Sequence, residues 1–591
     1  MTKALAPAVV LLGLMLGLWG IRWGLPDSRR LSRIMPPGLD GAAFQTELAN
    51  SWYALDQELG ENRDLNPKAS SVFAGLIDVP AGWTTPPKEL LNSYRSFYVR
   101  TEQEDEQSIL IVLSHMKPRQ LQFRTHQFAY GALYIYSVGA ALAAGAATGL
   151  VTLKASLLVY LGDPSKMAAM YLAGRLLSVA AFTACGLMLL RLGRSYVGLE
   201  AGAFGAAIFL MTPAAVVNSH LLKIHMFWAF FALWAVERSA HVLRRGALKD
   251  YAAAGTVAGL AMASFLGAWP ACLVVGAAGA MRLAGLHEPD GRPQKPLPEL
   301  QGLLVSGLCA VAAFLIISPY WILDFGEARA QMTRANGLVG GLHPTHPWLF
   351  IRTALRHSVT DPVLTLMFGG TALALFKGRR EPALLLCAVA FLLGLVFIVT
   401  VGIVVPTVQV RYFLGWAGVG ALLAGRLLQE LRAQKGVAGR LGTATAAIVL
   451  AGLACQGISY ARNYSLDEGD RSNHVLAGEW IEKNVPAGET IGLLRLPQPS
   501  NSPFFRYDRY RLRFIDPKAA ATLPPEKLPR WLALTWPDFF EDRAALGPTL
   551  SRYELRADFE PVTPFPWIRI DPTSTPANPA VELYRLTEKP G

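Results

Sequence analysis

Long apolar runs alternate with short polar connections through most of this chain. The first run, residues 4–24, is long enough to cross the roughly 30 Å hydrocarbon core of a bilayer as an α-helix. Lys3 precedes it and no small-residue cleavage site follows, which favours a retained membrane anchor. Further membrane helices are predicted at residues 167–190, 196–215, 226–243, 251–267, 269–284, 301–320, 360–376, 382–405, 410–427 and 441–459. The pattern therefore predicts an α-helical polytopic membrane protein.

Two long polar regions interrupt this pattern. Residues 25–128 form a loop that is too long to be a simple connection. The C-terminal region is polar and proline-rich, with a helix predicted at 472–485 and strands at 491–496, 510–515, 531–536 and 581–586. We therefore expect four parts: a first transmembrane helix (1–24), a large extracytoplasmic loop (25–128), a multi-spanning domain (129–460) and a small extracytoplasmic α/β domain (461–591).

Positive charge is distributed unevenly among the short connections. Alternate connections are rich in lysine and arginine, whereas 212–225, 266–270 and 402–409 together contain only Lys223. Because short basic loops remain in the cytoplasm, the N-terminus is predicted to be cytoplasmic and the C-terminal region extracytoplasmic. The glycine-broken run 130–161 must then start and finish outside, so it crosses an even number of times or not at all. The expected total is 11 or 13 spans.

Composition supports the membrane class and excludes others. Of 591 residues, 52% are hydrophobic and only 17% are charged, against roughly 25% in soluble proteins. The net charge of +12 lies in the short connections rather than on a basic face with aromatics, so no nucleic-acid partner is expected. The five cysteines lie in apolar runs without metal-ligand spacing. The high alanine, glycine and arginine content is typical of a bacterium, which predicts the inner membrane.

Polar residues of unusual type gather at the outer ends of the predicted helices rather than inside them. A transporter would carry ionisable residues within its spans. We therefore predict a site at the outer membrane surface that a lipid-borne substrate reaches from the side. Its candidate residues are Asp105, Glu106, Arg124, His220, Lys223, His225, Tyr320 and Arg411.

The acidic stretch at residues 101–107 offers the best-placed general base. Asp105 is the preferred base, and Glu106 is a second candidate that orients its neighbour. The alternative for this stretch is a solvated acidic surface. Asp27, nearer the first apolar run, is a rival base, because about 80 residues separate that run from Asp105.

Several motifs follow one another in a consistent order: Asp105-Glu106, then residues 128–136 (FAYGALYIY), 173–178 (AGRLLS), 218–225 (NSHLLKIH), 318–324 (SPYWILD), 411–414 (RYFL) and 480–486 (WIEKNVP). Together they resemble the protein-mannosyltransferase-like group (family 39) of GT-C-fold glycosyltransferases. The resemblance covers about residues 100–490, and it rests on the order and spacing of the motifs rather than on any single one.

The resemblance implies transfer of a sugar from a polyprenyl-phosphate donor to an acceptor hydroxyl outside the cytoplasm, with inversion. The loop carboxylate would act as general base. Positive groups among Arg124, His220, Lys223, His225 and Arg411 would stabilise the leaving phosphate. The family often has a second acidic residue where this chain has His225, so a carboxylate-bound divalent metal is not supported and no cofactor is expected.

Other interpretations compete with these assignments. His220, Lys223, His225 and Arg411 are also typical of helix-end anchors that reach the lipid headgroups, and Tyr320 of an aromatic belt. At the level of the whole protein, the alternatives are a non-catalytic envelope-assembly protein and a transporter for a lipid-linked substrate. The sugar is left open, as is the acceptor, which is a glycan, a lipid or a protein.

Overall fold

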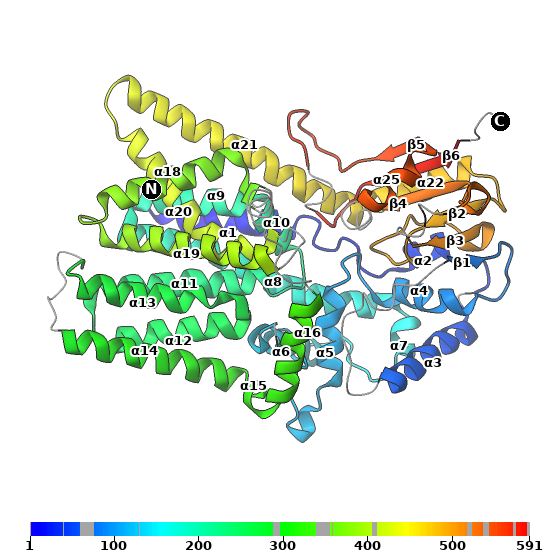
Figure 1. Ribbon diagram of the computed structural model, residues 1–591, viewed down its shortest axis with the longest axis horizontal. Helices are drawn as coiled ribbons and strands as arrows, with labels where there is room; N and C mark the ends of the chain where they lie inside the picture. The colour runs from blue at the N-terminus through cyan, green and yellow to red at the C-terminus, as the bar shows by residue number, and fades with distance from the viewer. Residues whose placement is uncertain are drawn as a thin grey trace. The chain divides into compact units, whose positions relative to one another are not determined.

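The computed structural model describes residues 2–39, 41–59, 76–128, 130–287, 296–338, 355–356, 359–404, 410–516, 520, 523–535, 543–570 and 575–587 (Figure 1). The described chain is mainly helical and forms two compact units. The first consists of Met1–Leu18, His115–Ala140 and Arg175–Ile458. The second consists of Trp19–Ser114, Ala141–Gly174 and Ser459–Gly591.

The long helices coincide with the predicted apolar runs, and most belong to the first unit. They are α1 (Thr2–Leu18), α8 (Pro164–Leu192), α9 (Leu199–Met211), α10 (Pro213–Ser219), α11 (His225–Arg245), α12 (Leu248–Ser264), α13 (Pro270–Leu283), α14 (Pro296–Ile317), α18 (Asp361–Lys377), α19 (Pro382–Val404), α20 (Leu414–Arg432) and α21 (Val437–Glu468). Helices α8 and α21 continue into the second unit. Each predicted run therefore contains a helix, but the first run, predicted over 4–24, is helical only as far as Leu18 and continues as turns.

Five described helical stretches are long and apolar enough to cross a bilayer: Pro164–Val197, Leu266–Leu283, Pro296–Ile317, Pro382–Val399 and Val437–Glu468. Helices α9 and α10 would form a sixth as a pair bent by 63°. The bend follows from Pro213, which holds Thr212 in an extended conformation (ψ 143°). The fold is therefore that of a helical membrane protein, and the total of 11 or 13 spans stays a prediction.

The doubtful run 130–161 contains two helices that are short for a crossing. Helix α6 (Ala132–Ala147) has 16 residues and α7 (Leu158–Leu161) has four, whereas a bilayer requires roughly 20. The run therefore lacks the pair of full-length spans that an even number of crossings would require. Of the two sequence-based alternatives, short helices without a full crossing describe it better.

Close helix contacts in the first unit depend on small residues. A Cβ added at Gly255 of α12 would overlap the carbonyl oxygen of Ser306 on α14, and one at Gly259 would overlap that of Ala310. This spacing of four residues is the small-xxx-small pattern that lets two helix backbones approach in a membrane. The apolar runs determine where helices form, and Gly255 and Gly259 allow α12 and α14 to pack closely.

A six-stranded mixed sheet is the centre of the second unit, with strand order β1-β3-β2-β4-β6-β5. The strands are β1 (Leu76–Val79), β2 (Thr490–Leu493), β3 (Arg511–Ile515), β4 (Trp531–Thr535), β5 (Tyr553–Phe559) and β6 (Val581–Leu586). Strand β2 is parallel to β3 and β4, and the other pairs are antiparallel. Four strands match predicted runs, whereas β1 and β5 were not predicted.

Strand β1 brings the long polar loop into the same sheet as the C-terminal region. Leu76 lies opposite Ile515, and Arg513 holds both carboxylate oxygens of Asp78, at 2.6 and 2.8 Å. The loop also forms α2 (Ser28–Ile34), α3 (Ala42–Leu59), α4 (Lys88–Val99) and α5 (Glu106–His115). The loop thus contributes one strand and several helices to a folded structure, and the sheet shares its second unit with α22 (Asn473–Asn484).

Candidate functional site

The eight candidate residues are divided between the two units. Asp105 and Glu106 belong to the second. The first contains Arg124, His220, Lys223, His225, Tyr320 and Arg411.

The acidic stretch is largely folded into the second unit. Glu102 is 4% exposed and Glu106 is fully buried. The Thr101 hydroxyl donates a hydrogen bond to the Glu106 carboxylate at 2.6 Å, and the Ser500 hydroxyl donates one to Glu104 at 2.8 Å. A solvated acidic surface therefore does not describe these carboxylates.

Asp105 is the more accessible residue of the predicted catalytic pair. It is half-buried and directly precedes α5, where its carbonyl oxygen accepts a hydrogen bond from the Ser108 hydroxyl at 2.6 Å. The unpaired N–H groups and the dipole at a helix N-terminus stabilise a negative charge there. Glu106 begins the helix with its side chain enclosed, which suits a positioning residue better than one that meets a substrate.

The rival base Asp27 caps a helix. Its Oδ1 accepts a hydrogen bond from the backbone N–H of Arg30 at 2.7 Å, which is the N-cap interaction of α2. Its Oδ2 lies 3.2 Å from the Arg29 guanidinium. Both carboxylate oxygens thus have structural partners.

Buried ionisable side chains that the sequence did not single out lie near Glu102. The Glu102 carboxylate is 3.5 Å from Nδ1 of His474, which is fully buried on α22. Arg30 and Asp467 are buried with them, at 4% and 8% exposure. Burial lowers the pKa of His474 to about 4, so the imidazole is neutral at physiological pH.

Arg30 holds the backbone next to the acidic stretch. Its guanidinium donates hydrogen bonds to the carbonyl oxygens of Gly24, Phe97 and Arg100, at 3.2, 2.6 and 2.7 Å. The three hydrogen bonds that it donates compensate much of the cost of burying this charge. No local sequence pattern marks Arg30 or His474, because their contacts join segments far apart in the chain.

In the first unit, the basic residues between α10 and α11 are enclosed by protein. His220, Lys223 and His225 are 0%, 4% and 1% exposed. Nδ1 of His220 lies 2.8 Å from the carbonyl oxygen of Val216. A side chain that anchors a helix end extends outward to the lipid headgroups. The burial of these three residues therefore favours contacts within the protein over headgroup anchoring.

His225 and Arg411 are brought together around two aromatic rings. The His225 ring meets the rings of Phe265 and Tyr412 edge-on, with centroids 6.1 and 6.3 Å away. Tyr412 stacks on Phe265 at an interplanar angle of 13°, and the Arg411 guanidinium lies 5.7 Å from the Tyr412 centroid. Two candidate residues distant in sequence thus share one cluster.

Arg124 and Tyr320 form a separate group. Arg124 makes an ion pair with Asp324 at 2.6 Å, and the Tyr320 hydroxyl accepts a hydrogen bond from the backbone N–H of Phe123 at 3.0 Å. The hollow beside Tyr320 has a volume of only about 10 Å³, near the minimum for one water molecule. These contacts hold residues 123–128 to α15 (Tyr320–Leu323) and its neighbours.

No group of three or more His, Cys, Asp or Glu side chains is placed to hold a metal ion among the residues that the structure describes.

No family model and no curated sequence matches the chain. Solved structures similar to it include an oligosaccharyltransferase from Archaeoglobus fulgidus, with a TM-score of 0.40 and 11% identity over 89% of this chain and 74% of that one. ArnT from Cupriavidus metallidurans bound to undecaprenyl phosphate gives 0.41 and 14% over 82% and 93%. Arabinofuranosyltransferase AftD from Mycobacteria gives 0.35 and 13% over 81% and 41%.

These structures are GT-C glycosyltransferases, so the chain is similar to members of the class that its motifs resemble. They do not distinguish the family 39 group, which stays a prediction. At TM-scores below 0.5, the function of the chain has to be inferred from its own residues.

Proposed function

We propose that this chain is a GT-C-type membrane glycosyltransferase that moves a sugar from a polyprenyl-phosphate donor to an acceptor hydroxyl. The observation that carries the proposal is the position of Asp105. A partly exposed carboxylate precedes α5 next to an enclosed acidic partner, within a folded loop rather than on a solvated surface. A carboxylate fixed in this way is suited to accept the proton of a hydroxyl nucleophile.

In the proposed reaction, the acceptor oxygen attacks the anomeric carbon as Asp105 takes its proton. The bond between that carbon and the phosphate oxygen breaks, and the electron pair leaves with the lipid phosphate. Attack opposite the leaving group inverts the anomeric configuration. A phosphate already leaves readily, so one carboxylate suffices and no metal ion is required.

The developing charge on the phosphate needs fixed positive groups. We assign this function to Lys223 and Arg411, together with His220 and His225. Support comes from the burial of His220, Lys223 and His225 and from the aromatic cluster that contacts Arg411 and His225. Arg124 and Tyr320 are proposed to keep residues 123–128 in place for substrate binding.

The cellular setting is part of the proposal. We place the chain in the bacterial inner membrane, with its N-terminus in the cytoplasm and the reaction outside it, because basic residues are concentrated in alternate connections. The donor sugar is a hexose or a pentose, and the acceptor is a glycan, a lipid or a protein.

The experiment that tests the proposal is sugar transfer in proteoliposomes. Purified protein would be supplied with a panel of radiolabelled polyprenyl-phosphate sugars, and total membrane lipid extract would provide the acceptor. We expect label to move to an acceptor from at least one donor, with inverted anomeric configuration in the product and without dependence on divalent metal. Absence of transfer from every donor would favour the envelope-assembly or transporter alternatives.

A further inference from the structure

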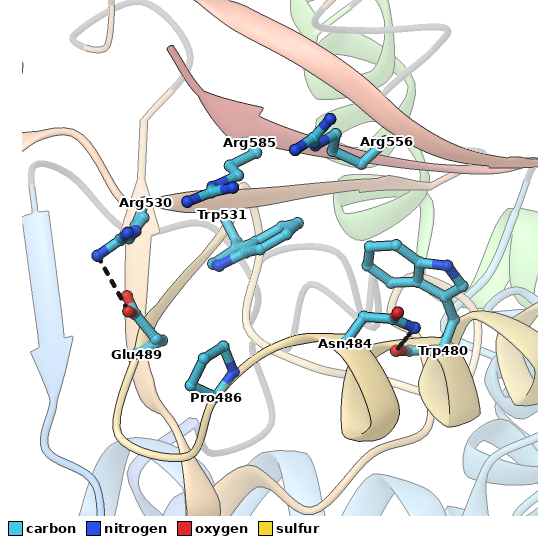
Figure 2. A pocket seen from close by; sticks show the side chains of 8 residues that line it. All are labelled: Trp480, Asn484, Pro486, Glu489, Arg530, Trp531, Arg556 and Arg585. Atoms are coloured by element: carbon cyan, nitrogen blue, oxygen red, sulfur yellow. Dashed lines mark hydrogen bonds and ion pairs between the residues drawn. The ribbon is translucent and has the colours of Figure 1, made fainter. Parts of the chain in front are cut away.

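A pocket in the second unit has none of the residues proposed to carry out sugar transfer in its lining (Figure 2). Its volume is about 420 Å³, within the range of small-molecule sites. Helix α22 contributes Trp480 to it. Strands β4, β5 and β6 contribute Trp531, Arg556 and Arg585, and Arg530 directly precedes β4.

The register of the sheet explains why these side chains meet. Trp531 of β4 lies directly opposite Arg585 of β6, so the two side chains share one face of the sheet. A bulge between Leu555 and Ala557 makes Arg556 an additional residue of β5. Bulges re-aim side chains, and here the bulged residue lines the same pocket as Arg585.

The lining is positively charged, with three arginines and one carboxylate, Glu489. Arg530 pairs with Glu489 at 3.1 Å, and Arg556 pairs with Glu554, outside the lining, at 3.1 Å. Partly exposed ion pairs of this kind are weak, so an anion can compete for both guanidinium groups. Arg585 has no carboxylate partner in the described part of the chain, and its guanidinium lies 5.6 Å from the Trp531 ring centroid.

Two indoles form the aromatic part of the pocket. The rings of Trp480 and Trp531 meet edge-on with centroids 5.8 Å apart. Trp531 is only 9% exposed, and its buried Nε1–H has no hydrogen-bond partner among the described residues. A buried indole N–H usually has an acceptor, so this one indicates a place for an acceptor atom of a ligand.

We propose that this pocket binds a negatively charged saccharide unit. The guanidinium groups of Arg556 and Arg585 match a carboxylate or a phosphate, which they bind through paired N–H groups. The half-buried Trp480 offers an aromatic face to a sugar ring, and Glu489 accepts a hydrogen bond from a hydroxyl. An inorganic anion would leave the indoles unused, and a neutral sugar would leave the arginines unused.

Calorimetric titration of the full chain in nanodiscs, with no polyprenyl-phosphate donor present, tests this site separately from sugar transfer. The titrants are a galacturonic acid oligosaccharide, a sugar phosphate, a neutral oligosaccharide of matched length and inorganic phosphate. We expect saturable binding of at least one anionic saccharide, at least about tenfold tighter than the neutral one and inorganic phosphate. The tighter of the two anionic ligands identifies the charged group that the pocket takes.

Variants assign the binding to the pocket. Arg585→Ala and Arg556→Ala should each weaken binding about tenfold. Arg509→Ala, at an exposed arginine of the same unit outside the pocket lining, should leave binding unchanged. Trp531→Phe keeps the ring and removes the N–H, and it should weaken binding with little change in the unfolding temperature.

Three results would overturn the proposal: no binding of either anionic saccharide, equal binding of the neutral one, or full affinity in both arginine variants. If Arg585→Ala does not fold, the affinity of Arg556→Ala tests the proposal. The Arg556 side chain is 39% exposed, so its truncation should leave the sheet intact.

Discussion

The Thr101 hydroxyl donates a 2.6 Å hydrogen bond to the carboxylate of Glu106, and both side chains are buried. A hydrogen bond to a buried charge contributes about 1.5–3 kcal/mol, and its loss leaves the carboxylate without this donor. Thr101→Val, which keeps the shape of the side chain, should therefore lower the unfolding temperature, as measured by scanning fluorimetry in detergent. Thr101→Ser keeps the hydroxyl and should stay near the wild type. Equal unfolding temperatures for all three proteins would show that this bond does not stabilise the acidic stretch.

The lowered pKa of His474 should make the stability of the folded chain depend on pH. Its pKa in the folded chain is about 4, lowered by burial from an ordinary value of 6.5. Between these values the unfolded chain binds a proton that the folded chain does not, so stability falls as the pH drops from about 6.5 to 4. The contribution of this group is on the order of 3 kcal/mol across that range.

His474→Gln should remove this part of the pH dependence. Unfolding temperatures measured from pH 7.5 to 4 should fall less steeply for the variant than for the wild type. Parallel curves for the two proteins would mean that His474 does not titrate on unfolding.

The close approach of α12 and α14 at Gly259 leaves no room for a larger side chain at this position. Because a Cβ there would overlap the carbonyl oxygen of Ala310, Gly259→Leu should separate the helices and cost about 1–3 kcal/mol or more. Gly307→Leu on α14 is the matched control, because a Cβ at Gly307 meets no atom within 4 Å. Thermal unfolding should distinguish the two variants, and an equal response would contradict the close approach of these helices.

Arg411 is predicted to contact the lipid phosphate. Loss of a charge-assisted hydrogen bond costs about 1.5–3 kcal/mol, so Arg411→Ala should lower kcat/KM for the polyprenyl-phosphate donor by about 10- to 100-fold. Arg411→Lys should recover part of this loss, because it restores the charge but not the planar fork. Arg440→Ala, at an exposed arginine at the start of α21, serves as the control. Wild-type kinetics in Arg411→Ala would show that Arg411 does not contact the phosphate of the donor.

The helices of this chain were predictable because long apolar runs leave the backbone no other way to satisfy its hydrogen bonds in a membrane. Strand β5 was missed because Glu554, Leu555 and Arg556 are all exposed, so its sequence lacks the alternation of a half-buried strand. Strand β1 was missed because four residues in a long polar loop carry little pattern. Local sequence gives the type of an element more readily than its partner in a sheet.

The same distinction applies to the candidate site. Asp105 was predicted from its place before a block of membrane helices, a property of the local sequence, and its function as the base stays a prediction. The contact between Glu102 and His474, and the meeting of His225 and Arg411 around Tyr412, depend on tertiary packing and were not predicted. Asp27 directly precedes helix α2, a position where aspartate commonly acts as an N-cap. Its position in the sequence was instead interpreted as that of a rival general base.

The most direct measurement compares single-turnover sugar transfer by the wild type, Asp105→Asn and Asp27→Asn in proteoliposomes, with folding and donor binding checked for each protein. Because a general base contributes at least about 10²-fold, Asp105→Asn should lower the rate of transfer by that factor or more while still binding the donor. Asp27→Asn should retain transfer, because its substitution affects the cap of α2. Wild-type transfer by Asp105→Asn, with loss in Asp27→Asn alone, would contradict the account and move the base to the start of the loop.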